Sequence, residues 1–283
     1  MKKRIMSGLL GGALVIILLT LGNTIIFNVM ISFISVIALY EIFVTTHFVR
    51  NKPLLIIGFL FAAVVPFFPV IGFSNYGVAI SCLFILAAFF VMLHQHSTIT
   101  ISEISFMFMM SILIPFALTS VLYINSLPTF FPEKYAQVDS FFLCLSTLEI
   151  AWFADIGAYF VGSFFGKRKL APSISPKKTV EGAIGGVIID VMLVLLFGLF
   201  WDLVILKDAG HIQYGYLALV AFLGSIIGII GDLSFSFIKR ECHIKDFGSI
   251  IPGHGGILDR FDSVLLVSPF VLLALHYVPI IVR

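Results

Sequence analysis

The chain has 283 residues, of which 60% are hydrophobic and only 11% are charged, and its formal net charge is +2. A soluble globular domain is nearer half apolar and a quarter charged, so this composition excludes that class and indicates a membrane protein. The three cysteines lie far apart in the sequence, which argues against a disulfide framework and against a cysteine zinc site.

Apolar runs divide the chain into nine predicted membrane spans, because a spanning helix needs about 20 mostly apolar residues. They cover residues 5–21, 25–46, 54–73, 76–93, 104–125, 140–161, 182–204, 214–237 and 263–281. Turn-forming residues such as Gly, Pro and Asn mark the breaks between the early spans. We therefore predict an all-α, polytopic integral membrane protein that forms a single membrane domain over residues 1–283.

The distribution of Lys and Arg predicts the orientation, since cytoplasmic loops are enriched in these residues. With the N-terminus in the cytoplasm, 14 of the 17 Lys and Arg residues fall in predicted cytoplasmic segments and the other three fall outside. The sequence thus predicts a multi-pass protein of the cell (inner) membrane whose charged loops face the cytoplasm.

The two halves of the chain differ in chemistry. Residues 1–125 are predicted spans without an assigned role, and we expect Glu41 and Glu103 to be interfacial or paired rather than reactive. No internal repeat is evident, which weighs against a transporter because many transporters are built from repeats. Residues 140–270 bring polar groups into the membrane, so we expect the catalytic spans and cytoplasmic loops there.

The first such polar group is Asp155, which lies inside a predicted span twelve residues before Lys167. That separation is roughly 18 Å along a helix. An ionisable side chain at such depth costs several kcal/mol, so it is a functional hypothesis by default. A structural pair with a lysine from another span is the alternative.

A basic loop follows, with five cations within the twelve residues from Lys167 to Lys178. Ser175-Pro176 predicts a helix N-cap followed by proline at the first helical position. A helix start beside Lys177, Lys178 and Thr179 would suit a phosphate group, because free N–H groups and cations meet there. Binding of anionic lipid headgroups is the alternative role for this loop.

Small residues predict how two spans pack. Gly182 and Gly186 form one G-x-x-x-G spacing and Gly224 and Gly228 form another, and this spacing lets helix backbones approach closely. We predict that these two spans pack together, which would bring Lys178 near Asp232.

The window from residue 231 to 262 gathers the charges of an otherwise apolar chain. Asp232, Ser236 and Lys239 fall on one helical face, while Asp259 and Asp262 share another. Carboxylates from two helix ends favour a hard cation such as Mg²⁺, which binds oxygen ligands and takes water and phosphate for the rest of its shell. Nearby cations would balance the charge of a polyphosphate during phosphoryl or nucleotidyl transfer.

This window also carries a long, irregular motif. Its parts are Ser236-x-x-Lys239-Arg240, Lys245-Asp246-x-Gly248 and Pro252-x-His254-Gly255-Gly256-x-x-Asp259-Arg260-x-Asp262. The motif resembles the signature of the phosphatidate cytidylyltransferases, and the segments 154–159 and 175–182 resemble that family too. The resemblance covers about the C-terminal half of the chain. Ser163 departs from it, because relatives often carry a basic residue there.

The resemblance implies an activity and a set of site residues. The family condenses CTP with phosphatidic acid, giving CDP-diacylglycerol and pyrophosphate, and Asp232 and Asp259 would hold Mg²⁺, in some members beside a monovalent cation such as K⁺. The predicted catalytic residues are Asp232, Asp259, Lys239, Arg240, Asp155, Asp246, His254 and Asp262. The predicted substrate-binding residues are Lys177, Lys178, Thr179, Ser175, Ser236, Lys245, Arg260, Gly255 and Gly256.

The expected partners are CTP, phosphatidic acid and the lipid bilayer, with no nucleic acid, and the sequence leaves a homodimer open. One alternative is a CTP-dependent polyprenol or phytol kinase, which would transfer the γ-phosphate and release CDP. A cation-coupled transporter, which would consume no nucleotide, is a more remote alternative, and a structural membrane protein is the remaining one.

Overall fold

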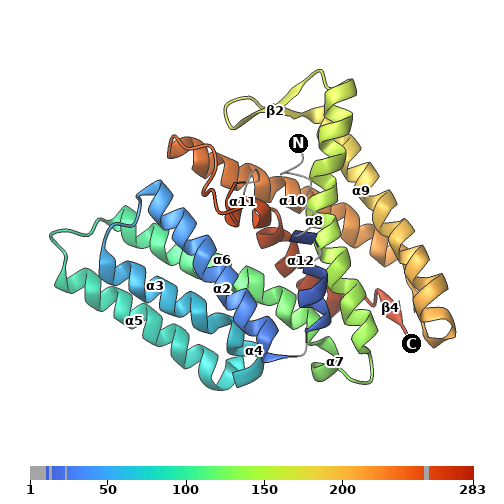
Figure 1. The fold of residues 1–283 in the computed structure, drawn as a ribbon, viewed down its shortest axis with the longest axis horizontal. Coiled ribbons are helices and arrows are strands. Elements are labelled where there is room, and N and C mark those ends of the chain that lie inside the picture. Colours follow the sequence, from blue (N-terminus) through green and yellow to red (C-terminus); the bar gives the residue numbers. More distant parts are fainter. Residues whose placement is uncertain (1–10, 13–14, 23, 252–254) are drawn as a thin grey trace. The chain divides into compact units, whose positions relative to one another are not determined.

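The computed structural model describes residues 11–12, 15–22, 24–251 and 255–283, and nearly all of the elements are helices. The chain divides into two compact units. One comprises Met1–Leu122 and Cys242–Phe261, and the other comprises Tyr123–Glu241 and Asp262–Arg283. The signature window is therefore shared between the units. Figure 1 labels the α-helices of both, together with strands β2 and β4.

Six described helical segments are long and apolar enough to cross a membrane, which confirms an all-α, polytopic membrane protein. They are Ile25–Thr46, Lys52–Ile71, Ile101–Asn125, Gln137–Phe165, Val180–Leu206 and Tyr214–Glu241. Two further predicted spans correspond to shorter helices, α5 (Val78–His94) and α12 (Val264–Tyr277). The first predicted span, 5–21, lies largely outside the described residues.

The first unit is a set of apolar helices joined by aromatic packing. Its elements are α2 (Ile25–Thr46), α3 (Lys52–Val64), η1 (Val65–Phe67), α4 (Phe68–Ile71), η2 (Phe73–Gly77), α5, most of α6 (Ile101–Asn125) and α11 (Leu258–Phe261). Figure 1 shows α2, α3 and α5 side by side. The Phe61 ring of α3 stacks on Phe84 of α5 at 4.1 Å, and Phe108 of α6 meets Phe84 edge-on. Such pairs add to the stabilisation from apolar burial.

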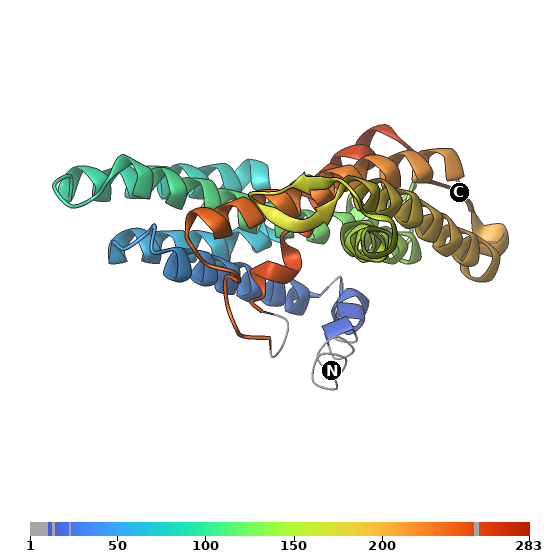
Figure 2. The same ribbon diagram turned by 90° about the horizontal axis from the view of Figure 1, so that it is seen from above.

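The second unit is arranged around the longest helix, α8 (Gln137–Phe165). Its other elements are α7 (Leu127–Phe130), β1 (Lys169–Ala171), β2 (Ser175–Thr179), α9 (Val180–Trp201), η3 (Asp202–Leu206), η4 (Lys207–Ala209), β3 (His211–Ile212), α10 (Tyr214–Glu241), α12 and β4 (Ile281–Val282). Figures 1 and 2 show α9 and α10 beside α8, and strand β4 pairs antiparallel with β3.

Glycines set the close approach of α8 and α9. A Cβ at Gly186 would lie 2.5 Å from the Ala154 carbonyl oxygen, and one at Gly182 would lie 2.7 Å from that of Ala158. Helices α9 and α10 do pack together, as predicted. Their glycines, however, face other neighbours, since Gly224 lies against Ile150 of α8. Gly228, by contrast, lies nearest to Val267 of α12, so the glycines of α10 are divided between two neighbouring helices.

The predicted helix start at Ser175-Pro176 is wrong, because these residues belong to a hairpin. Strand β2 pairs antiparallel with β1, and Lys169 lies opposite Thr179. Helix α9 begins at Val180, where the Thr179 hydroxyl accepts a hydrogen bond from Gly182 N at 3.1 Å. A two-stranded hairpin has only edge strands, which tolerate the missing N–H of Pro176, while a threonine cap satisfies the helix end.

Two polar anchors hold the hairpin segment in place. The Glu181 carboxylate, at the start of α9, accepts hydrogen bonds from Lys167 N and Arg168 N. At the hairpin turn, Arg240 Nε of α10 donates to the Ile174 carbonyl at 3.1 Å. The basic loop of the sequence is therefore an ordered element fixed to α9 and α10.

Candidate active site

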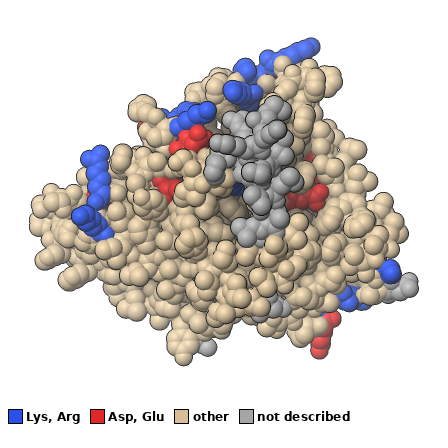
Figure 3. Space-filling model, in the orientation of Figure 1, with Lys and Arg blue, Asp and Glu red and all other residues tan. Residues whose placement is uncertain are grey.

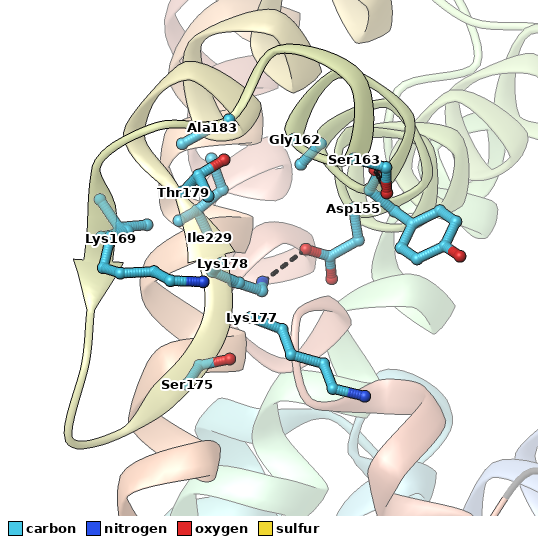
Figure 4. A pocket seen from close by; sticks show the side chains of 14 residues that line it. Asp155, Gly162, Ser163, Lys169, Ser175, Lys177, Lys178, Thr179, Ala183 and Ile229 are labelled. Carbon is cyan, nitrogen blue, oxygen red and sulfur yellow. Dashed lines mark hydrogen bonds and ion pairs between the residues drawn. The ribbon is translucent and has the colours of Figure 1, made fainter.

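A lysine from the hairpin lies between two carboxylates from different helices. Lys178 Nζ is 2.7 Å from Asp155 Oδ1 of α8 and 2.6 Å from Asp232 Oδ2 of α10 (Figure 4 marks the first contact). This confirms the predicted approach of Lys178 to Asp232. Burial lowers the pKa of Lys178, but the two carboxylates outweigh it and raise the pKa above its ordinary value. Lys178 is therefore a fixed cation.

A second pair, Lys239 and Asp262, lies in the same unit. Both residues are buried, and Lys239 Nζ is 3.8 Å from Asp262 Oδ2. Burial raises the pKa of Asp262 to about 7, with repulsion from Asp232 adding to the effect and Lys239 opposing it. Asp155 repels Asp262 as well, so three carboxylates and two lysines share one electrostatic environment.

The ion-paired lysine lines a cavity of about 500 Å³ between the hairpin and the helices α8 and α9. Its polar lining residues are Asp155, Tyr159, Ser163, Lys169, Ser175, Lys177, Lys178 and Thr179. Figure 4 shows the lysines on the hairpin strands and Asp155 opposite, on α8. Several ammonium groups and hydroxyls around one space are a suitable environment for phosphate. The predicted group of Ser175, Lys177, Lys178 and Thr179 is thus brought together.

The helices that form this cavity also have an exposed apolar surface. Phe160 and Phe164 of α8 are 55% and 78% exposed, and Ile184 and Ile188 of α9 are similarly exposed. A helix that is apolar all round and carries exposed apolar side chains is typical of a membrane span. The cavity therefore combines a basic, polar wall with flanking surfaces suited to lipid chains.

In the first unit, the part of the motif between α10 and α11 forms a loop, called the signature loop below, whose described residues are 242–251 and 255–257. The Asp259 carboxylate holds this loop together. This carboxylate is buried, and its Oδ2 accepts hydrogen bonds from Phe247 N and Gly256 N, both at 2.9 Å. Gly255 adopts a φ of +86°, a conformation that favours glycine, and its carbonyl accepts from Ile251 N. The motif glycines thus allow the loop to fold back on itself. His254 lies outside the described residues.

Glu41 is a contributor to this loop that the sequence reasoning missed. The sequence predicts an interfacial or paired Glu41, and in the structure the buried carboxylate on α2 accepts from Ile257 N at 3.0 Å and Leu258 N at 2.8 Å. Thr45, one turn later, donates to the Phe247 carbonyl at 2.7 Å. The only signal in the sequence was a carboxylate inside an apolar span, which must find a partner.

The remaining predicted residues are distributed over both units. Ser236 is half-buried on α10, and Arg240 contacts the hairpin. Lys245, Asp246 and Arg260 are exposed residues of the first unit. Figure 3 shows such charged groups at a few places on a largely uncharged face.

The predicted metal ligands Asp232 and Asp259 belong to different compact units. Their shared metal site therefore stays a prediction. Within the described part of the chain, no group of three or more His, Cys, Asp or Glu side chains forms a metal cluster.

Comparisons with known proteins agree with the motif. A model of the "Cytidylyltransferase family" matches residues 2–278. A phosphatidate cytidylyltransferase of Bacillus subtilis is 36% identical over 282 residues, which cover 95% of this chain and 96% of the relative. One of Haemophilus influenzae is 43% identical over 129 residues, 46% of this chain and 44% of the relative. One of Staphylococcus epidermidis is 41% identical over 154 residues, 54% and 56% of the two chains. With its signature residues, its helical membrane fold and a family match over nearly its whole length, this chain belongs to the cytidylyltransferase family.

Proposed function

We propose that this chain is a phosphatidate cytidylyltransferase, which converts CTP and phosphatidic acid to CDP-diacylglycerol and pyrophosphate. The similar Bacillus subtilis protein carries that name and is matched over 96% of its length. The observation that carries the proposal is the cavity beside Lys178, where a lysine-rich wall meets helices with exposed apolar surfaces. A lipid that ends in a phosphate group would match both features, with its phosphate at the lysines and its apolar chains at the exposed apolar side chains.

In the proposed reaction, an oxygen of the phosphatidate phosphate attacks the α-phosphorus of CTP. The bond from that phosphorus to the β-phosphate oxygen breaks, and pyrophosphate leaves. The protein need not supply a general base, because a phosphate monoester is already ionised near neutral pH. Lys169, Lys177 and Lys178 would hold the phosphates and offset their charge, so that positioning and electrostatics supply the catalysis.

We also propose that Mg²⁺ takes part, held by Asp232 and Asp259. Asp232 carries two carboxylate oxygens, and the Lys178 ammonium contacts one of them, Oδ2, at 2.6 Å. Carboxylate oxygens suit Mg²⁺, which needs only one or two of them when water and phosphate complete its shell. A bound Mg²⁺ would neutralise charge on the phosphate oxygens of the substrate.

The proposed site opens toward the cytoplasm, where CTP is found. The excess of Lys and Arg in the predicted cytoplasmic segments supports this orientation. The hairpin from β1 to β2, which carries three of the cavity lysines, is one of those segments.

The proposal is tested with purified protein, CTP, phosphatidic acid and Mg²⁺, with and without a chelator. We expect CDP-diacylglycerol only with the metal, and we expect Asp232→Asn and Asp259→Asn to abolish its formation while the helical content stays unchanged. Near-normal turnover in both variants would remove the metal assignment.

A further inference from the structure

The carboxylate of Glu41 lies against the signature loop, although the two are more than 200 residues apart in the sequence. We infer that Glu41 is a positioning residue, which holds this loop so that Asp259 is presented to the substrates. The inference rests on the proposed function, because that function gives the loop its role. It assigns a task to the N-terminal spans, for which the sequence offers none.

The contacts of Glu41 are specific in number and direction. Its two carboxylate oxygens each accept one hydrogen bond, from the adjacent amides of Ile257 and Leu258. The residue is 3% exposed, so water cannot readily replace the carboxylate. Hydrogen bonds to a charged group are each worth about 1.5–3 kcal/mol, and a buried amide left without a partner costs a similar amount.

Two glycines of the loop leave room for this carboxylate. A Cβ at Gly256 would lie 2.5 Å from Glu41 Oε2, and one at Gly248 would also overlap the carboxylate. The loop therefore passes the Glu41 side chain twice, once at each glycine. The glycines of the motif are explained here by close approach to Glu41 rather than by a turn alone.

The same loop also carries its own carboxylate. Leu258, held by Glu41, directly precedes Asp259, and Asp259 in turn accepts from Gly256 N and Phe247 N. Four loop amides are thus divided between two carboxylates, one from α2 and one from the loop itself. Loss of the Glu41 contacts would release the backbone on the N-terminal side of Asp259 and change the direction of its side chain.

The chain supplies a matched control for this role. Glu103, in the first turn of α6, accepts from the adjacent amides Arg50 N and Asn51 N at 2.6 and 2.8 Å. It is buried, belongs to the same unit and makes the same kind of contact, but with a segment outside the motif. Glu103→Gln therefore measures the structural cost of losing such a contact.

The experiment compares Glu41→Gln, Glu103→Gln and Asp259→Asn in the full chain. For each we would measure the thermal midpoint, kcat and KM for CTP and for phosphatidic acid, and hydrogen exchange of the Phe247, Gly256, Ile257 and Leu258 amides. We expect Glu41→Gln to lower kcat at least about tenfold, equivalent to one lost charged hydrogen bond, and to speed exchange at these amides. Glu103→Gln should keep kcat within about twofold, because Glu103 holds a segment that lies outside the motif.

A second measurement serves if Glu41→Gln folds poorly. Gly248→Ala alone should lower activity, because the added methyl group meets the Glu41 carboxylate. Exchange of the Ile257 and Leu258 amides should also become faster in this variant, and normal activity with normal exchange would contradict the inference.

The outcomes distinguish a failure of the role inferred for Glu41 from a failure of the proposed function. If Asp259→Asn is inactive and Glu41→Gln has normal kcat and normal amide exchange, the inference fails and the proposed function stands. If both glutamate variants lose activity equally, Glu41 is merely structural and the inference fails. Full activity in Asp259→Asn would overturn the role of the loop in the proposed function itself.

Discussion

At the scale of single residues, Lys178 connects three elements of the second unit. Its ammonium group, from β2, contacts carboxylates of α8 and α10, and all three side chains are only partly exposed. Two carboxylates at this separation repel each other unless a cation lies between them. Lys178 thus fixes the polar wall of the cavity before any substrate binds.

Replacing this lysine should therefore damage catalysis. Lys178→Met keeps most of the side-chain volume but removes the charge, and loss of one partner from a hydrogen-bonded charge pair costs about 2–5 kcal/mol. We expect kcat/KM for phosphatidic acid to fall by about 30-fold or more. Lys167→Met, an exposed lysine of the same segment that does not line the cavity, is the control and should stay within about twofold. Equal effects in the two variants would contradict a specific role for Lys178.

The sequence was sufficient to predict part of this site. Asp155 and Asp232 stood out because each is an acid within an apolar span. The predicted packing of α9 on α10 placed Lys178 near Asp232, although the glycines on which that prediction relied face other neighbours. Glu41 could not be assigned in the same way, because its contacts with Ile257 and Leu258 span 216 and 217 residues. Such a contact depends on the tertiary fold, which no local pattern in either segment encodes.

At the scale of elements, the contact between α8 and α9 positions Asp155 opposite the hairpin. Gly186 lies against the Ala154 carbonyl, one residue before Asp155. In a membrane the hydrophobic effect does not drive helices together, so close backbone packing has to supply the attraction. The glycine is therefore tied to the geometry of the site as well as to the fold.

Gly186→Ala should move the two helices apart. The added methyl group would meet backbone atoms, which cannot rotate away, so we expect a loss of about 1–3 kcal/mol in stability and a lower kcat. Gly215→Ala is the control, because a Cβ at Gly215 of α10 has no atom within 4 Å. It should leave the thermal midpoint unchanged or raise it slightly, since alanine favours a helix. Thermal unfolding in detergent, together with an activity assay, distinguishes the two.

Element types were predicted better than element ends. Long apolar runs predicted the spanning helices, since length and composition alone determine that signal. The start of α9 was misplaced by about one turn, because Ser175-Pro176 fits a helix start in sequence but lies in a hairpin strand. Pairing of that strand with residues 169–171 is what decides between the two conformations.

At the scale of the whole molecule, an ion pair stabilises the end of the second unit at which α8 begins. Arg283 donates two hydrogen bonds to the Asp139 carboxylate, from Nε at 2.7 Å and from a terminal nitrogen at 3.0 Å. Asp139 is fully buried in the first turn of α8, and Arg283 follows strand β4. The pair therefore links α8 to the end of the chain, away from the cavity residues.

Arg283→Ala should lower the stability of the protein and leave its catalysis unchanged. It leaves a buried carboxylate without its cation, a change that typically costs about 3–5 kcal/mol and should be nearer the lower figure here because Arg283 is partly exposed. We expect a clearly lower thermal midpoint, with kcat unchanged below the unfolding range. A loss of kcat without a loss of stability would show that this end of the unit takes part in catalysis.

In the proposed reaction, the molecule as a whole joins the nucleotidyl part of CTP to a lipid phosphate. The direct measurement supplies phosphatidic acid, Mg²⁺ and CTP labelled at either the α- or the γ-phosphorus, and then follows the label. We predict that the α-label enters the lipid as CDP-diacylglycerol and that the γ-label is released in pyrophosphate. Transfer of the γ-label to a lipid, with CDP as the other product, or no consumption of CTP at all would contradict the account.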